Sequence, residues 1–305
     1  MSATTAAGGW SWNVVTDVHQ LFAYPFMVNA FLAGTIVAVA AAVVGWFMVL
    51  RRQTFAGHTL ALIGFPGAAG ATLVGISAAA GYFGFAILGA LVVAATRASG
   101  TAYRGFSEES AVVGTVQAFA LAAGFLFVAL YKGFLNGVNS LLFGTFLGIT
   151  VGQVWALLLV AVVALIVLGL IGRPLLFASV DPDVAAARGV QVRLLGVLFL
   201  VLLGVAVAEA SQITGSLLVF ALLVMPAAAA QRFTPRPVAG LVLSVVIAVT
   251  VTWLGLVVAY YSPYPMGFYI TTFAFAVYLA SFVVRHLVDR HGSAPARALH
   301  ARVGT

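Results

Sequence analysis

Long apolar runs separated by short polar connections occupy most of the chain. A segment that crosses the hydrocarbon of a bilayer must satisfy its own backbone hydrogen bonds, so runs of about 20 apolar residues predict membrane-spanning helices. Nine such runs are present, at residues 26–50, 55–77, 80–96, 111–131, 151–171, 194–214, 217–230, 238–261 and 266–284. The seventh is short and contains Pro226, so a broken, re-entrant or fused helix is an alternative there. The pattern predicts an all-α integral membrane protein, a polytopic bundle of about eight or nine transmembrane helices.

The amino-acid composition argues against a soluble protein. Of the 305 residues, 63% are hydrophobic and 7% are charged, whereas a soluble domain is about half apolar and about a quarter charged. The chain has no cysteine, which excludes disulfides and thiolate metal sites. No basic stretch precedes the first apolar run, so this run is expected to be retained and not removed as a signal peptide.

The basic residues predict how the chain is oriented. Short cytoplasmic loops of membrane proteins carry an excess of Lys and Arg. With the loop after the first run in the cytoplasm, all 13 arginines fall inside and only Lys132 falls outside. We therefore expect a multi-pass protein of the cytoplasmic (inner) membrane, with an extracytoplasmic segment 1–25, a transmembrane domain 26–284 and a cytoplasmic tail 285–305. Since the basic residues are scattered singly, no nucleic acid is expected as a partner.

One cytoplasmic connection predicts a short helix, at residues 179–190. Asp181 and Asp183 stand where acidic residues favour a helix start, Arg188 stands near the end, and Gly189 provides the stop. A soluble helix of this size rarely stands alone, so a partner is expected to cover it.

Two ionisable residues within the apolar runs are candidates for function, because such residues are expensive inside a bilayer. His58 lies near the start of the second run, where a neutral imidazole could bind a transition metal ion. Glu209 lies late in the sixth run, with Gln212 one turn away, and could attract a cation from outside. The alternatives are a histidine bonded to a carbonyl or to water, and a glutamate that fixes helix packing.

Neutral amides supply weaker candidates. Gln117 and Gln153 belong to the fourth and fifth runs, where an amide can simply hold helices together. Asn139 lies in the glycine-punctuated stretch 133–148, which is too short to span and is expected to dip back toward the membrane as a cap on the pore.

Sequence signatures of catalysis are missing from the chain. Neither a P-loop nor the Gly-x-Ser-x-Gly or His-Glu-x-x-His pattern occurs. We therefore expect that the chain is not an enzyme, that it has no cofactor of its own and that it does not hydrolyse ATP itself.

Several segments together resemble the membrane subunit of the metal-uptake family of ATP-binding-cassette (ABC) importers, the zinc and manganese permeases. The strongest is Gly-Ser-Leu-Leu-Val-Phe-Ala-Leu-Leu-Val-Met-Pro-Ala at residues 215–227. Further matches are Arg51-Arg52, Glu108-Glu109-Ser110, Ser-Leu-Leu-Phe-Gly at 140–144, and Asp181-Pro-Asp followed by Ala-Arg-Gly189. The likeness covers about residues 26–284.

The resemblance implies a permease of the type II importer architecture that forms a homodimer. An extracytoplasmic metal-binding protein would deliver the ion, and two cytoplasmic ABC ATPase subunits would dock on the helix containing Asp181, Asp183, Arg188 and Gly189. The family's second-helix pair of an acid and a histidine is changed here, because His58 replaces the acid and Leu62 replaces the histidine.

The transport path implied by these observations uses His58 and Glu209 as metal contacts, with Gln212 and Asn139 as further path residues. The cargo is expected to be a divalent transition metal ion, zinc ahead of manganese. Two alternatives stay open: a permease of the same architecture for a metal chelate such as a siderophore or corrinoid, and a channel or carrier that works without an ATPase.

Overall fold

The computed structural model describes residues 19–98, 106–131, 144, 148–216 and 219–292. Within these ranges the regular elements are helices, which confirms the predicted all-α class. In chain order they are α2 (Pro25–Leu50), α3 (Thr54–Leu73), α4 (Ala78–Ala98), α5 (Phe106–Leu130), α7 (Val151–Val180), α8 (Pro182–Ala187), α9 (Val192–Thr214), α10 (Val219–Phe233), α11 (Pro237–Tyr260) and α12 (Met266–Gly292).

Seven of the described helices are long and apolar enough to cross a membrane: α2, α4, α5, α7, α9, α11 and α12. Helices α3 and α10 complete the bundle. With 15 residues, α10 rises only about 22 Å, which is less than the roughly 30 Å of a hydrocarbon core. It runs through Pro226 as one helix and is separate from α9. The seventh apolar run is therefore a short helix of its own.

Two helices continue beyond the apolar runs that predicted them. Helix α7 passes residue 171 and Pro174 and ends at Val180, so the predicted helix 179–190 is reduced to α8 at 182–187. Helix α12 runs on to Gly292, into the predicted tail. Apolar character ends where the hydrocarbon ends, whereas a helical backbone needs only its own hydrogen bonds and continues into polar residues.

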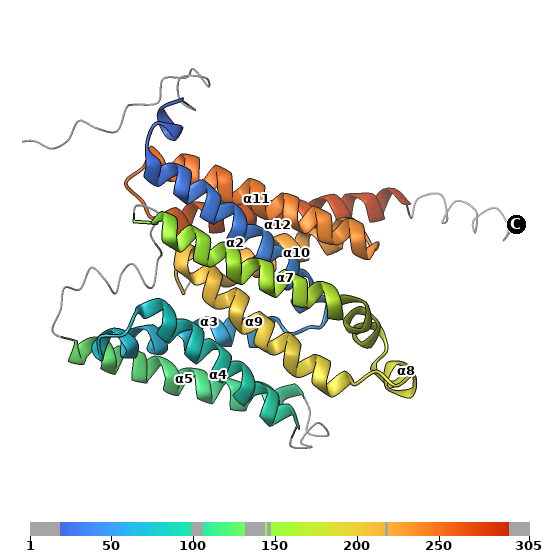
Figure 1. Cartoon of the computed structure of the whole chain (residues 1–305). Coiled ribbons are helices and arrows are strands. Elements are labelled where there is room, and N and C mark those ends of the chain that lie inside the picture. Colours follow the sequence, from blue (N-terminus) through green and yellow to red (C-terminus); the bar gives the residue numbers. More distant parts are fainter. Residues whose placement is uncertain (1–18, 99–105, 132–143, 145–147, 217–218, 293–305) are drawn as a thin grey trace, which may run out of the picture.

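The helices form two packed groups, with α9 between them and α7 packed on α2 and α9 (Figure 1). In one group α3 packs on α4 and α5, and in the other α2, α10, α11 and α12 pack on one another. Helix α9 contacts both groups, whereas α2 and α3 barely touch although they are consecutive. Helix α8 and the C-terminal end of α12 lie at the same end of the bundle, on the right of Figure 1.

Close backbone approaches hold each group together. A Cβ atom added to Gly67 of α3 would lie 2.4 Å from the carbonyl oxygen of Gly81 in α4, and one added to Gly45 of α2 would lie 2.0 Å from that of Leu223 in α10. Glycine at these positions lets two helices approach until their backbones touch, which is the usual mode of helix packing in membranes.

Candidate functional site

His58 lies on the second turn of α3 and is half-buried. Its ring centroid is 5.0 Å from that of Phe220, at an interplanar angle of 66°. This edge-to-face arrangement is favourable for aromatic rings. Because α3 and α10 belong to different helix groups, the contact of His58 with Phe220 bridges the two groups.

A hydrogen bond next to His58 joins α3 to α5. The hydroxyl of Thr59 is 3.1 Å from Gln117 Oε1 and 3.0 Å from the Phe55 carbonyl oxygen. Thr59 itself is fully buried. The amide of Gln117 is therefore turned toward α3 and holds α5 at the level of the histidine.

Glu209 is completely buried in α9, the helix between the two groups. Neither of its carboxyl oxygens has a hydrogen-bond partner within the described part of the chain, so it is not bonded to His58. An unpartnered carboxyl group in an apolar interior is costly. The structure thus places the two predicted metal contacts on neighbouring helices without joining their side chains.

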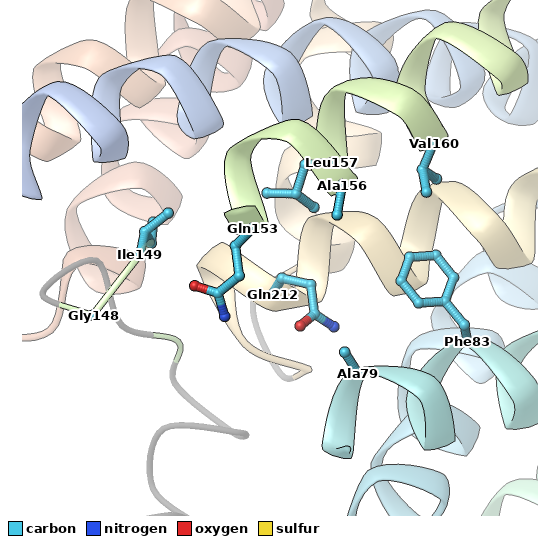
Figure 2. Close-up of a pocket in the computed structure, with 9 residues that line it drawn as sticks. All are labelled: Ala79, Phe83, Gly148, Ile149, Gln153, Ala156, Leu157, Val160 and Gln212. Carbon is cyan, nitrogen blue, oxygen red and sulfur yellow. The ribbon is translucent and has the colours of Figure 1, made fainter. Parts of the chain in front are cut away.

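Gln212 and Gln153 line one cavity beside the first turn of α7 (Figure 2). Helix α8 follows the other end of α7. The cavity has a volume of about 170 Å³. Gln212 Nε2 donates to the Ala208 carbonyl at 3.2 Å, and Gln153 Oε1 accepts from the Thr150 backbone N–H at 2.9 Å as part of a capping box. The other lining residues are mostly apolar: Ala79, Phe83, Gly148, Ile149, Ala156, Leu157 and Val160. His58 and Glu209 do not line this cavity.

The four residues predicted for ATPase coupling lie together on and around α8. Asp181 caps the helix, since its Oδ1 accepts from the Val184 N–H at 3.0 Å. Gly189 ends it with φ +83°, a backbone conformation that favours glycine. Asp183 and Arg188 are exposed, whereas Ala185 is completely buried. The short helix is thus anchored by one face and presents charged residues on the other.

Sequence reasoning missed Phe220 and the bond between Thr59 and Gln117. Phe220 belongs to the 215–227 motif, whose apolar pattern indicates packing and gives no sign of a histidine partner. Asn139 lies outside the described residues. Among the residues that the structure describes, no group of three or more His, Asp or Glu could hold a metal ion. A full set of metal ligands is therefore not assembled by the described part of one chain.

Residues 23–285 match the ABC 3 transport family. The chain belongs to this family. Membership agrees with the several apolar helices of the bundle, and it confirms the family expected from the 215–227 and 181–189 motifs.

Several named proteins are similar to this chain over most of its length. The manganese import system permease protein ScaB of Streptococcus parasanguinis is 27% identical over 267 residues, which are 88% of this chain and 93% of that protein. The chelated iron transport system membrane protein YfeC of Yersinia pestis is 30% identical over 273 residues, 90% of each chain. A chain of PsaBC from Streptococcus pneumoniae, solved in complex with Fab, superposes with a TM-score of 0.79 at 24% identity and covers 88% of this chain and 95% of that chain. This last likeness shows that the chain shares its fold with the matched chain of PsaBC.

Proposed function

We propose that this chain is the membrane permease of an ABC importer that moves a divalent transition metal ion across the cytoplasmic membrane, powered by a separate ATPase. The family match over residues 23–285 carries the proposal. The relatives described above are named for manganese and for chelated iron. We therefore place manganese ahead of zinc, the metal that the sequence favoured.

The exposed face of α8 is the proposed docking site for the ATPase. Its charged residues face away from the bundle, and only Ala185 anchors it. Arg51, at the end of α2, bonds to Ser179 just before α8, so Arg51 and Arg188 lie at the same end of the bundle. This clustering supports a cytoplasmic location for α8 and for the C-terminus, with the N-terminus outside. A second copy of the chain and an extracytoplasmic metal-binding protein complete the proposed assembly.

The proposed ion path passes His58, where α3 meets α10. A half-buried imidazole can bind an ion and release it again, and a permease needs weak sites, because a strong one slows release. Glu209 and Gln212 of α9 and Asn139 of the 133–148 stretch are the further proposed path residues. In a homodimer each copy would contribute one His58, so that two histidines would be available to the ion.

Uptake and co-purification together test this function. Tagged permease, expressed together with its candidate ATPase and binding protein, is expected to bring down the ATPase when it is purified. The cells are expected to take up radioactive manganese in an ATP-dependent manner. The variant His58→Ala is expected to slow uptake at least about tenfold, equivalent to about 1.4 kcal/mol of barrier. His286→Ala removes an exposed histidine of α12 and serves as the matched control. ATP-independent uptake, or the absence of any ATPase, would contradict the importer assignment.

A metal chelate is the second candidate for the cargo. Two observations favour it: the described residues assemble no set of three metal-binding side chains, and YfeC is named for chelated iron. A chelate keeps its own ligands and needs only a path of suitable size and polarity. Uptake of a doubly labelled siderophore complex decides between the two, because a chelate permease imports metal and ligand together, whereas a metal-ion permease imports only the metal.

A further inference from the structure

Arg51 contacts three helices at the end of the bundle where α8 lies. It is the C-cap residue of α2. Its Nη1 donates to the hydroxyl of Ser179 in α7 at 3.1 Å, and its guanidinium carbon is 5.4 Å from the ring centroid of Phe199 in α9. Gly196 of α9 lies beside the guanidinium, since a Cβ atom built there would be 3.8 Å from Nη2.

Ser179 connects this contact to α8. It is the next-to-last residue of α7, two residues before the Asp181 cap of α8. Its hydroxyl accepts from Arg51 and donates to the Leu175 carbonyl one turn earlier, so both of its bonding directions are used. Helix α8 packs on α7 and α9, the same two helices that the guanidinium touches. A displacement of α8 therefore reaches Ser179, and with it the bond to Arg51, within one helical turn.

On its other side Arg51 begins the tight turn into α3. The backbone N–H of Arg51 donates to the Phe47 carbonyl, and that of Gln53 donates to the Met48 carbonyl. Arg52 between them has φ +55°, a strained conformation for a residue other than glycine. Helix α3 starts at Thr54 and carries His58 on its second turn. Such a short, hydrogen-bonded turn has little freedom to absorb movement before it reaches α3.

We propose that Arg51 is a positioning residue that passes movement of α8 to α3 through Ser179 and the 51–53 turn. The inference rests on the proposed function, in which an ATPase moves α8. A shift of α7 and α9 relative to α2 changes the angle at which α3 begins, and with it the separation of His58 from Phe220. Arg51 acts on the path through α3 and does not itself contact the cargo.

The number of metal ions moved per ATP hydrolysed tests this linkage. The full complex of permease, ATPase and binding protein is reconstituted in proteoliposomes, and manganese uptake and ATP hydrolysis are measured in the same preparation. Arg51→Gln is expected to lower the ratio about tenfold while hydrolysis continues, as expected for loss of a hydrogen bond to a charged group. Ser179→Ala removes only the hydroxyl, keeps helix α7, and is expected to lower the ratio in the same direction.

Two further variants separate linkage from general damage. Arg51→Lys keeps the charge and a donor, and is expected to recover most of the ratio. Ser281→Ala removes a buried hydroxyl that donates to the Tyr278 carbonyl of its own helix, and is expected to leave the ratio unchanged. The double variant Arg51→Gln with Ser179→Ala is expected to be no worse than Arg51→Gln alone, because both changes break one interaction.

Different results overturn the linkage and the proposed function. If the parent complex transports metal with ATP but Ser179→Ala leaves the ratio unchanged, or if the two changes add, Arg51 does not pass movement through Ser179. The same holds if Arg51→Gln lowers uptake and hydrolysis in equal proportion. If the parent complex itself moves no metal with ATP, the importer assignment fails, whatever the variants do.

Discussion

Replacing Glu209 by leucine removes a completely buried carboxyl group whose oxygens have no hydrogen-bond partner within the described residues. Leaving such a group unsatisfied costs about 1–3 kcal/mol, and more if it is charged. Leucine has a similar size and no polar atom. We therefore expect the free energy of unfolding to rise by about 1–3 kcal/mol. We also expect metal uptake to fall about tenfold, because a residue kept at a cost to stability is typical of a functional site.

The assay measures stability and transport on the same preparations. Parent and variant are unfolded by denaturant in detergent, followed by tryptophan fluorescence, and are then reconstituted for manganese uptake. Gln212→Leu, one turn along α9, is the matched control for the stability measurement. It removes a bond to the Ala208 carbonyl and is expected to lower stability by about 0.5–1.5 kcal/mol. If Glu209→Leu unfolds more easily than the parent, the carboxyl group has a partner and the reasoning is refuted. If Glu209→Leu is more stable than the parent and takes up manganese equally fast, Glu209 is not a residue of the transport path.

Four other substitutions test the coupling helix and the packing. Gly189→Ala places a side chain at φ +83°, which costs about 1–2 kcal/mol of backbone strain. The affinity of the permease for its ATPase, measured in a binding titration, is therefore expected to fall. An unchanged affinity would show that α8 is not the docking site. Gly45→Ala, with its Cβ 2.0 Å from the Leu223 carbonyl oxygen, is expected to lower the free energy of unfolding by about 1–3 kcal/mol. Gly169→Ala, where the added Cβ atom meets open space, is expected to raise the free energy of unfolding by about 1 kcal/mol. If both glycine variants changed this free energy equally, the close approach of α2 to α10 at Gly45 would be contradicted. Thr59→Val removes the hydroxyl that donates to the half-buried Gln117 amide of α5, and is expected to lower the free energy of unfolding by about 0.5–1.5 kcal/mol. Stability equal to that of the parent in denaturant would disprove this.

The helices were predictable because the bilayer demands long apolar runs. Each of the nine runs corresponds to a helix of the structure. The ends were less predictable, since α7 continues through Pro174 and α12 continues past residue 284 into charged residues. Hydropathy reports where the hydrocarbon stops, but a helix ends only where its backbone hydrogen bonds are capped or broken.

The parts of the site that depend on local sequence were predictable, and those that depend on packing were not. Asp181 and Gly189 cap α8 as expected, because a cap and a left-handed stop involve only neighbouring residues. The contact between His58 and Phe220 joins helices far apart along the chain. So does the bond between Arg51 and Ser179. No local pattern contains such contacts, because they depend on how helices that are far apart along the chain pack against one another.

The position of His58 between the two helix groups explains how few ligands the proposed path needs. Helix α3 is fixed to α4 and α5 by close packing, and α10 is fixed in the same way to α2, so each group can move as a rigid body. Movement between the groups must then change the contact of His58 with Phe220, since these residues lie on opposite sides of the boundary. We infer that a histidine in this position would be covered in one arrangement and accessible in another. Transport can therefore depend on the geometry of the boundary more than on the strength of the site.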